Sequence, residues 1–209
     1  MKHLKDSKFI TFEGIEGVGK STLIRFLANK LSINNIPYVV TREPGGTKLG
    51  EALRNILLHE KCSITNMAEL LIVFASRAQH LEEIIKPALK NNQWVICDRF
   101  IDATYAYQGA GRKMNIENIQ TLEKLVVDDI LPDYTFVLDA PINVSFARIQ
   151  NRMQLDRFEV ETVDFFERIR EAYLQRALLN PTRYKVIDAT LSIEEVQQSI
   201  WDVLQYEWV

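Results

Sequence analysis

Residues Gly14 to Ser21 have the types and spacing of a phosphate-binding loop. The segment Gly14-Ile-Glu-Gly-Val-Gly-Lys-Ser21 fits G-x-x-x-x-G-K-[ST] at every fixed position. Glycines let the backbone fold closely around an anion, and the amides at the start of the next helix point toward it. In such a loop Lys20 reaches the β- and γ-phosphates, and the Ser21 hydroxyl binds Mg²⁺. The stretch predicts a site for a nucleoside triphosphate.

The segments on either side of the loop have the periodicity that this motif requires. Phe9 to Glu13 is rich in β-branched and aromatic residues, which is typical of a buried strand. After the loop, apolar residues recur at helical spacing, at Leu23, Phe26, Leu27 and Leu31. A strand, a glycine loop and a helix in this order argue against a chance glycine turn.

Arg42 follows a second predicted strand, Tyr38 to Thr41. It opens the segment Arg42-Glu-Pro-Gly-Gly-Thr47, whose proline and glycines exclude regular structure and whose threonine can cap a following helix. In α/β proteins, ligands bind beyond the carboxyl ends of the strands. We therefore favour a contact between Arg42 and a ligand, with a surface salt bridge to Glu43 as the alternative.

Asp98 and Arg99 follow the third predicted strand, Trp94 to Cys97. An aspartate at this place can order Mg²⁺ through water, and an arginine can hold a phosphate with two parallel hydrogen bonds. The next stretch, Asp102 to Arg112, mixes hydroxyls, an amide and glycines. We expect it to be the polar wall of a pocket rather than a core helix.

The longest helical pattern runs from about Asn66 to Lys90, and we expect Pro87 to kink or end it. Arg77 flanks the apolar stripe of this pattern. It could be a packed residue with a salt bridge or a ligand contact, and the pattern favours neither. His80 lies on the same predicted helix, where a surface or hydrogen-bonded histidine is the expectation rather than a catalytic base.

Two further predicted strands, Tyr134 to Leu138 and Tyr184 to Ile187, complete a set of five that alternate with helices. This alternation predicts an α/β fold with a parallel sheet covered on both faces. The length of 209 residues suits a single domain spanning residues 1–209.

The composition argues against several classes of function. With 25 basic and 28 acidic residues, the net charge of −3 argues against a broad nucleic-acid surface. Cys62 and Cys97 form neither a disulfide framework nor a zinc motif, and the three histidines lack the spacing of a metal site. The N-terminal residues contain no apolar signal region, and no run of about eighteen apolar residues occurs. We expect a cytoplasmic protein without membrane association.

Glycine loops of this type serve kinases, switches and motors. A guanine-nucleotide switch would need Asp-x-x-Gly, and no glycine here has an aspartate three residues before it. A motor or an assembly ATPase would need partner-binding regions for which this chain is too short. A small-molecule kinase remains. The rival interpretations are a deoxynucleoside kinase, which requires a carboxylate base, and an ATP-binding regulator without transfer activity.

The whole chain resembles the thymidylate kinases in their bacterial form. Six motifs in the family's order carry the resemblance, which spans about residues 8 to 190: Phe12-Glu-Gly-Ile-Glu-Gly-Val-Gly-Lys-Ser-Thr22, Thr41-Arg-Glu-Pro-Gly-Gly-Thr47, Phe74-Ala-Ser-Arg77, Asp98-Arg99, Ala106-Tyr-Gln-Gly109 and Leu155-Asp-Arg157. The resemblance implies a P-loop NTPase fold with a lid at about 148–159. It also implies transfer of the γ-phosphoryl of ATP to dTMP, with Mg²⁺, by a homodimer.

The resemblance also assigns the donor side of the site. Residues that would bind ATP are Gly14, Ile15, Glu16, Gly17, Val18, Gly19, Lys20, Ser21, Thr22 and Arg148. Ser21 and Asp98 would hold the metal. Lys20, Arg99, Arg152 and Arg157 would act in catalysis, because the loop between Gly14 and Gly19 has no basic side chain and the lid arginines would supply charge to the transferring phosphoryl.

On the acceptor side, Arg42 and Arg99 would hold the dTMP phosphate. Arg77 and Gln108 would hydrogen-bond the thymine, with Thr104 nearby. Tyr107 would lie against the sugar, and Glu16 would contact the 3′-hydroxyl, although Glu16 could simply point outward. The family often has its stacking aromatic four residues before the arginine, where this chain has Val73. Phe74 could take that role instead.

Overall fold

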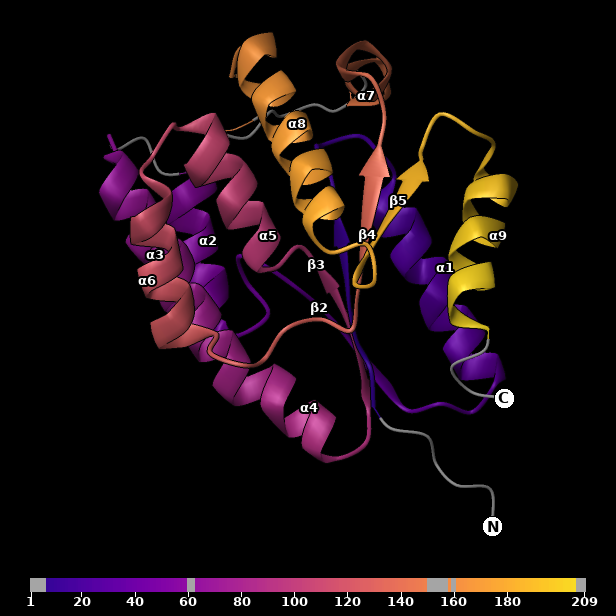
Figure 1. Cartoon of the computed structure of the whole chain (residues 1–209). Helices are drawn as coiled ribbons and strands as arrows, with labels where there is room; N and C mark the ends of the chain where they lie inside the picture. The colour runs from indigo at the N-terminus through magenta and orange to yellow at the C-terminus, as the bar shows by residue number, and fades with distance from the viewer. Residues whose placement is uncertain (1–6, 60–62, 150–157, 159–160, 206–209) are drawn as a thin grey trace.

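Five short segments rich in β-branched and aromatic residues form one parallel sheet at the centre of the protein (Figure 1). The computed structural model describes residues 7–59, 63–149, 158 and 161–205. The strands are β1 (Phe9–Glu13), β2 (Tyr38–Arg42), β3 (Trp94–Asp98), β4 (Tyr134–Asp139) and β5 (Tyr184–Asp188). Their order is β2-β3-β1-β4-β5, and every neighbouring pair is parallel. The predicted fold class is confirmed.

β1 is the central strand, and all five of its residues are buried. The chain passes from β1 to the β2 edge, returns to β3, and then crosses to β4 and β5 on the other side of β1. The order of strands therefore reverses at β1. In open parallel sheets a crevice forms at the carboxyl ends of the strands beside such a reversal. The glycine loop leaves β1 at this point.

Helices cover both faces of the sheet. α1 and α9 lie together on one side, and α3, α5, α6 and α8 lie on the other (Figure 1). The helices are α1 (Lys20–Ile33), α2 (Lys48–His59), α3 (Asn66–His80), α4 (Lys86–Lys90), α5 (Ile101–Thr104), α6 (Ile116–Val126), α7 (Ile142–Ile149), α8 (Val163–Leu179) and α9 (Ile193–Leu204), with π-helical turns η1 (Leu81–Ile85) and η2 (Tyr105–Gly111). No helix in the described part of the chain is long and apolar enough to cross a membrane.

Local sequence explains how several helices begin. Thr47 Oγ1 accepts a hydrogen bond from the Gly50 amide at 2.9 Å, so the predicted cap of α2 is present. Ser192 and Glu195 form a reciprocal capping box at the start of α9. Such caps satisfy amides that a helix cannot pair internally.

The structure corrects two expectations about local structure. Pro87 does not end the helical stretch, which reaches Lys90 as expected, but the regular α-helix is interrupted by the π-helical turn η1 directly before the proline. Pro87 has no amide to donate within this continuous helical stretch, and the π-helical turn accommodates it there. The stretch after Arg99 is helical rather than irregular: α5 and η2 run from Ile101 to Gly111, and nearly all their residues are buried.

Candidate active site

The glycine loop joins β1 to α1 at the switch point of the sheet. Gly14 has φ 132°, and a Cβ atom there would lie 2.5 Å from the carbonyl oxygen of Leu138, so only glycine fits. Lys20 Nζ donates to the carbonyl oxygens of Gly14 at 3.0 Å and Ile15 at 2.8 Å. Burial, followed by repulsion from Arg99, lowers the pKa of Lys20 to about 8. An anion in the loop would favour the charged amine.

A polar cavity of about 460 Å³ extends from the loop, and we call it the phosphate groove. Its lining contains six cationic and three anionic side chains. The cationic residues are Lys20, Arg25, Arg42, Arg54, Arg99 and Arg148, and the anionic ones are Glu16, Glu43 and Asp98. Ser21 and Thr22 also line it. A groove with this excess of positive charge suits a polyanionic ligand.

A second cavity, which we call the acceptor cavity, adjoins the groove. Eight of its fifteen lining residues are apolar or aromatic: Pro44, Leu57, Leu58, Val73, Phe100, Ala103, Tyr107 and Phe158. Three polar side chains, Arg77, Thr104 and Gln108, also line it. Glu16, Glu43, Arg54 and Arg99 line both cavities. The pattern of apolar walls with a few polar groups is typical of a small-molecule site.

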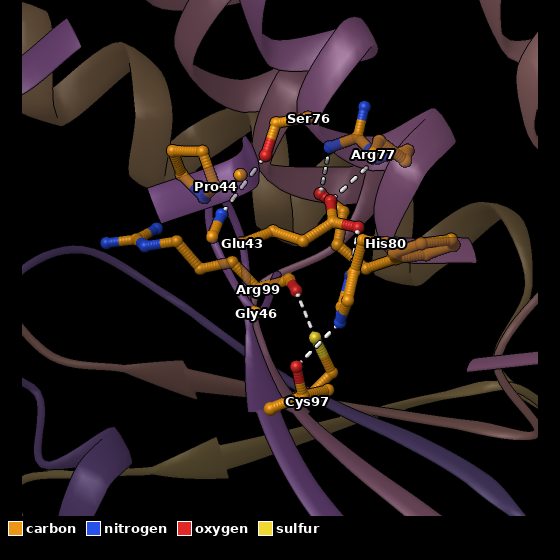
Figure 2. Close-up of polar contacts among 12 residues, drawn as sticks. Glu43, Pro44, Gly46, Ser76, Arg77, His80, Cys97 and Arg99 are labelled. Atoms are coloured by element: carbon orange, nitrogen blue, oxygen red, sulfur yellow. Dashed lines mark hydrogen bonds and ion pairs between the residues drawn. The ribbon is translucent and has the colours of Figure 1, made fainter. Parts of the chain in front are cut away.

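Arg77 is buried and has a fixed set of partners (Figure 2). Its Nε donates to Glu43 Oε2 at 2.7 Å, and its Nη2 donates to the carbonyl oxygen of Phe100 at 3.1 Å. Its Nη1 and the Thr104 hydroxyl are both buried without a partner among the described residues. A buried polar atom without a partner is costly, so these two atoms point to a ligand in the cavity.

Glu16 pairs with two residues at the boundary of the cavities. Arg99 Nη2 donates to Glu16 Oε1 at 2.9 Å, and the Tyr107 hydroxyl donates to the same oxygen at 2.6 Å. Burial raises the pKa of Tyr107 well above its usual value, so the hydroxyl stays protonated and remains a donor. These contacts contradict the outward orientation considered for Glu16, and they compensate a carboxylate inside an anion-binding loop.

Arg99 has an uncommon backbone conformation, and its side chain has fixed partners. Its φ of 68° lies in the left-handed region, which is unfavourable for a residue with a Cβ atom. Its Nη1 donates to the Tyr173 hydroxyl at 3.1 Å, and that hydroxyl donates to Glu13 Oε2 at 2.8 Å. Burial, and next the charge of Asp102, raises the pKa of Glu13 to about 8. Arg99 is thus braced from β1 and from α8.

Other predicted site residues lie around the groove. Arg42 pairs with Glu51 at 2.7 Å rather than with Glu43, and its side chain remains 52% exposed. Arg148 Nη2 donates to the carbonyl oxygen of Ala189 at 3.0 Å. Ser21 and Asp98 line the same groove, and Asp98 Oδ1 is buried without a partner among the described residues. The groove therefore brings together most of the predicted donor-side residues: Glu16, Gly17, Gly19, Lys20, Ser21, Thr22, Asp98 and Arg148. Gly14, Ile15 and Val18 are not among the described residues that line it, and the side chains of Ile15 and Val18 are buried in the core.

Some predicted residues are not brought to the cavities. Phe74 is buried in the core with its ring 5.0 Å from the Arg77 guanidinium carbon, whereas Val73 lines the acceptor cavity. Both residues lie within about one helical turn of Arg77. Phe74 does not reach the cavity because its ring packs into the core cluster that contains Phe9, Leu70 and Phe100. Arg152 and Arg157 lie outside the described residues, as does most of the predicted lid at 148–159.

Two residues of the site were not recognised from the sequence. Arg54 lies on α2, lines both cavities, and donates from Nη1 to the carbonyl oxygen of Pro44 at 2.9 Å. Burial, and then repulsion from Arg42, lowers its pKa. The other is Glu43, which pairs with Arg77. A signal for Arg54 existed, since it lies on the helix that follows the Pro44-Gly-Gly46 segment at the end of β2.

The switch-point glycine loop, the cation-lined groove and the adjoining apolar cavity define a P-loop nucleotide kinase. The sequence model described as thymidylate kinase matches residues 12–200 of this chain. The chain therefore belongs to the thymidylate kinase family, and it is an enzyme of that family.

Individual relatives agree with this assignment. A thymidylate kinase of Vesicomyosocius okutanii is 47% identical over 203 residues, which cover 97% of this chain and 99% of that protein. One from Pseudomonas putida strain GB-1 is 52% identical over 193 residues, which cover 92% of each chain. The crystal structure of thymidylate kinase from Ehrlichia chaffeensis matches with a TM-score of 0.78 at 39% identity, covering 96% of this chain and 99% of that one. The resemblance and the P-loop NTPase fold expected from the sequence are confirmed.

Proposed function

We propose that the groove and the acceptor cavity hold the two substrates of one reaction, transfer of the γ-phosphoryl of ATP to dTMP, giving dTDP and ADP. One observation carries the assignment of the two sites: Glu16, Arg54 and Arg99 line both cavities. A nucleotide with its base in the acceptor cavity would therefore place its phosphate beside the glycine loop. This arrangement turns the reaction into a transfer between positioned groups.

The acceptor cavity is suited to a keto pyrimidine. An arginine can only donate hydrogen bonds, so the unpartnered Nη1 of Arg77 requires an acceptor such as the O4 carbonyl of thymine. The amino group of cytosine at that position is itself a donor, so it could not accept the hydrogen bond from Arg77. Thr104 and Gln108 would complete the contacts to the base, with Tyr107 and Glu16 at the sugar.

The phosphates would be held by arginines and the loop. Arg42, Arg54 and Arg99 would bind the acceptor phosphate, and Lys20 with the loop amides would bind those of ATP. Mg²⁺ fits the pair of oxygen donors that Ser21 and the unpartnered Asp98 Oδ1 offer, and when bound it would neutralise charge on the β- and γ-phosphates.

This chemistry needs no general base on the protein. The phosphate of the acceptor has a second pKa of about 6, so it is already mostly a dianion at pH 7. A deoxynucleoside kinase would have to remove a proton from a 5′-hydroxyl. The task here is to bring two polyanions together and to stabilise charge in the transition state, which is work for arginines.

A coupled assay of ADP release with dTMP, dUMP, UMP, dCMP, dGMP and thymidine tests this function. We expect dTMP to give the highest kcat/KM, with UMP and dCMP far lower. Turnover of thymidine without turnover of dTMP would overturn the proposal in favour of a deoxynucleoside kinase. An absence of turnover together with an absence of thermal stabilisation by saturating dTMP would favour an ATP-binding regulator.

The lid arginines complete the proposal. Arg152 and Arg157 would grip the phosphoryl group chiefly in the transition state. Arg152→Ala or Arg157→Ala should lower kcat by roughly 10²–10⁴-fold, comparable to the loss of an arginine finger, and leave the dTMP Kd unchanged. If both variants keep kcat within about threefold of the wild type, which is under ~0.7 kcal/mol of barrier, the lid arginines have no such role.

We further propose a cytoplasmic homodimer with one domain per chain. Met67 and Leu71 lie four residues apart on α3 and are 44% and 50% exposed, which suits a helix packed against a second copy. Light scattering at micromolar concentration tests the dimer. A monomeric mass would contradict it.

A further inference from the structure

The carboxylate of Glu43 has two partners, and only one of them is the arginine of the acceptor cavity. Glu43 Oε2 accepts from Arg77 Nε at 2.7 Å, and Glu43 Oε1 contacts His80 Nδ1 at 2.9 Å. The side chains of all three residues are at most 2% exposed. Figure 2 shows Glu43 lying between Arg77 and His80. A shared carboxylate therefore links the histidine to the arginine.

The contacts of His80 determine which ring nitrogen carries the proton. Its Nε2 lies 2.6 Å from Thr41 Oγ1, and its Nδ1 faces a carboxylate that can only accept from a donor. With the proton on Nδ1, the ring donates to Glu43 and accepts from the Thr41 hydroxyl. All three side chains are then satisfied. The contact with the carboxylate requires a hydrogen on Nδ1.

The imidazole ring has no room to turn away. A Cβ atom on Gly46 would lie 2.7 Å from His80 Cδ2 and 2.8 Å from Nε2, so the loop packs directly on the ring. The same loop is tied to α3 a second time, because the Gly45 amide donates to Ser76 Oγ at 3.1 Å. His80 is thus fixed between the Pro-Gly-Gly loop and its own helix.

We propose that His80 is a positioning residue for recognition of the base. It occupies Oε1 of Glu43, so that Glu43 binds Arg77 at Nε alone and Nη2 keeps its contact with the carbonyl oxygen of Phe100. The guanidinium then keeps the orientation in which Nη1 is unpartnered and available to the substrate. This inference rests on the proposed role of Arg77 at the thymine. His80 touches no substrate and acts through Glu43 and Arg77.

Loss of the histidine would leave one carboxylate oxygen of Glu43 without a donor. Without a donor at Oε1, the carboxylate of Glu43 would have a free oxygen in a buried place, and such an atom seeks a partner. The second donor on the guanidinium edge that Glu43 already binds is Arg77 Nη2, which now donates to the carbonyl oxygen of Phe100. A carboxylate that takes Nε and Nη2 together would draw Nη2 away from Phe100 and turn the guanidinium. Nη1 would then lose its alignment with the O4 carbonyl of thymine. The enzyme would then discriminate less between thymine and cytosine.

Two amide substitutions separate the functions of the ring nitrogens. His80→Asn places an amide near the position of Nδ1 and can still donate to Glu43. His80→Gln places its amide near Nε2, keeping the contact to Thr41 but losing the donor to Glu43. His59→Gln, at an exposed histidine of α2, is the matched control. The measurement is kcat/KM for dTMP and for dCMP, with the KM for ATP alongside.

We expect His80→Gln to lower the dTMP-to-dCMP ratio of kcat/KM about tenfold, mainly through the KM for dTMP, because one charged hydrogen bond to the base is compromised. The ATP KM should stay unchanged. His80→Asn and His59→Gln should keep the ratio within about twofold of the wild type. In an Arg77→Ala background, His80→Gln should cause no further loss of the ratio, because its effect passes through Arg77.

Several results would overturn the inference. An equal fall for dTMP and dCMP after His80→Gln means that the histidine only stabilises the fold. A further loss of the ratio in the Arg77→Ala background means that it acts by another route. If His80→Gln does not fold, His80→Asn and the near-isosteric Thr41→Val decide. Thr41→Val should lower the ratio about threefold, because it removes the hydrogen bond that holds the ring at Nε2. An unchanged ratio would refute the proposal. A wild type with no dTMP turnover would instead refute the proposed function.

Discussion

Glu16 and Glu43 each hold an arginine of the acceptor cavity, but they do so in opposite surroundings. The Glu43–Arg77 pair is sealed in the protein, with side chains 2% and 1% exposed. The Glu16–Arg99 pair lies where the two cavities meet, with side chains 16% and 14% exposed. Each glutamate also takes a second partner, His80 in one case and Tyr107 in the other.

The difference indicates a division of tasks. Two charges in a sealed pair attract each other strongly, and a change of partner would leave both charges buried and unpaired. The Glu43–Arg77 pair therefore keeps one arrangement of its side chains. A pair beside an open groove can exchange, and an arriving phosphate can compete with Glu16 for Arg99. We infer a rigid arrangement that recognises the base and an adjustable one that binds the phosphate.

The largest expected effect comes from breaking the sealed pair. Glu43→Ala leaves Arg77 buried without its counter-charge, so the free energy of unfolding should fall by about 3–5 kcal/mol in urea titrations. The control is Glu82→Ala, which breaks an exposed pair with Lys86 and should cost about 1 kcal/mol or less. Equal losses in the two variants would show that burial does not separate the two kinds of pair.

The next effect comes from the arginine of the open pair. Arg99→Ala should weaken equilibrium binding of dTMP and lower kcat/KM by roughly 10²–10³-fold, because a charged contact to the acceptor phosphate is lost in the ground state. Isothermal titration with dTMP and steady-state kinetics measure the two quantities. An unchanged dTMP Kd would place the contribution of Arg99 in the transition state alone.

A buried amine in the same groove predicts a pH dependence. The pKa of Lys20 is about 8 in the ligand-free protein, and bound phosphate favours its charged form. ATP affinity should therefore be constant below pH 8 and fall about tenfold per pH unit above it, since binding then requires uptake of a proton. Fluorescence titrations from pH 6.5 to 9.5 test this, and Lys20→Met should remove the dependence.

The smallest effect should come from Glu16→Gln. The amide still accepts from Arg99 or Tyr107, and the pair is partly solvated, so stability should change by less than about 1 kcal/mol. The kcat/KM for dTMP should fall no more than about tenfold, as expected for one weakened contact to the sugar. A loss of stability as large as that of Glu43→Ala would contradict the contrast between the two pairs.

Much of the fold could be predicted because local sequence and tertiary structure agree. The strands begin at the predicted residues, and the glycine loop lies between a buried strand and a helix as its motif requires. The π-helical turn η2 was missed because hydroxyls and glycines suggest loops, whereas here burial against α8 and α6 overrides that preference.

The partners of the charged residues were harder to predict. Arg42 and Glu43 are neighbours in extended chain, so their side chains point to opposite sides and pair with Glu51 and Arg77 instead. The sequence predicted a surface or hydrogen-bonded histidine at position 80, and the structure confirms the hydrogen-bonded one. Its partner, however, is known only from the packing of α3 against the end of β2, and no periodicity encodes that contact.

The brace on Arg99 has a consequence for synthesis of the chain. The hydrogen bond from Tyr173 to Glu13 joins residues 160 positions apart, so a loop of that length must close before Arg99 gains this support. On the ribosome, the glycine loop and the sealed Glu43 pair emerge long before α8 does. A nascent chain halted before residue 163 should therefore not be protected from proteolysis by dTMP, and the growing protein would capture its acceptor only near the end of translation.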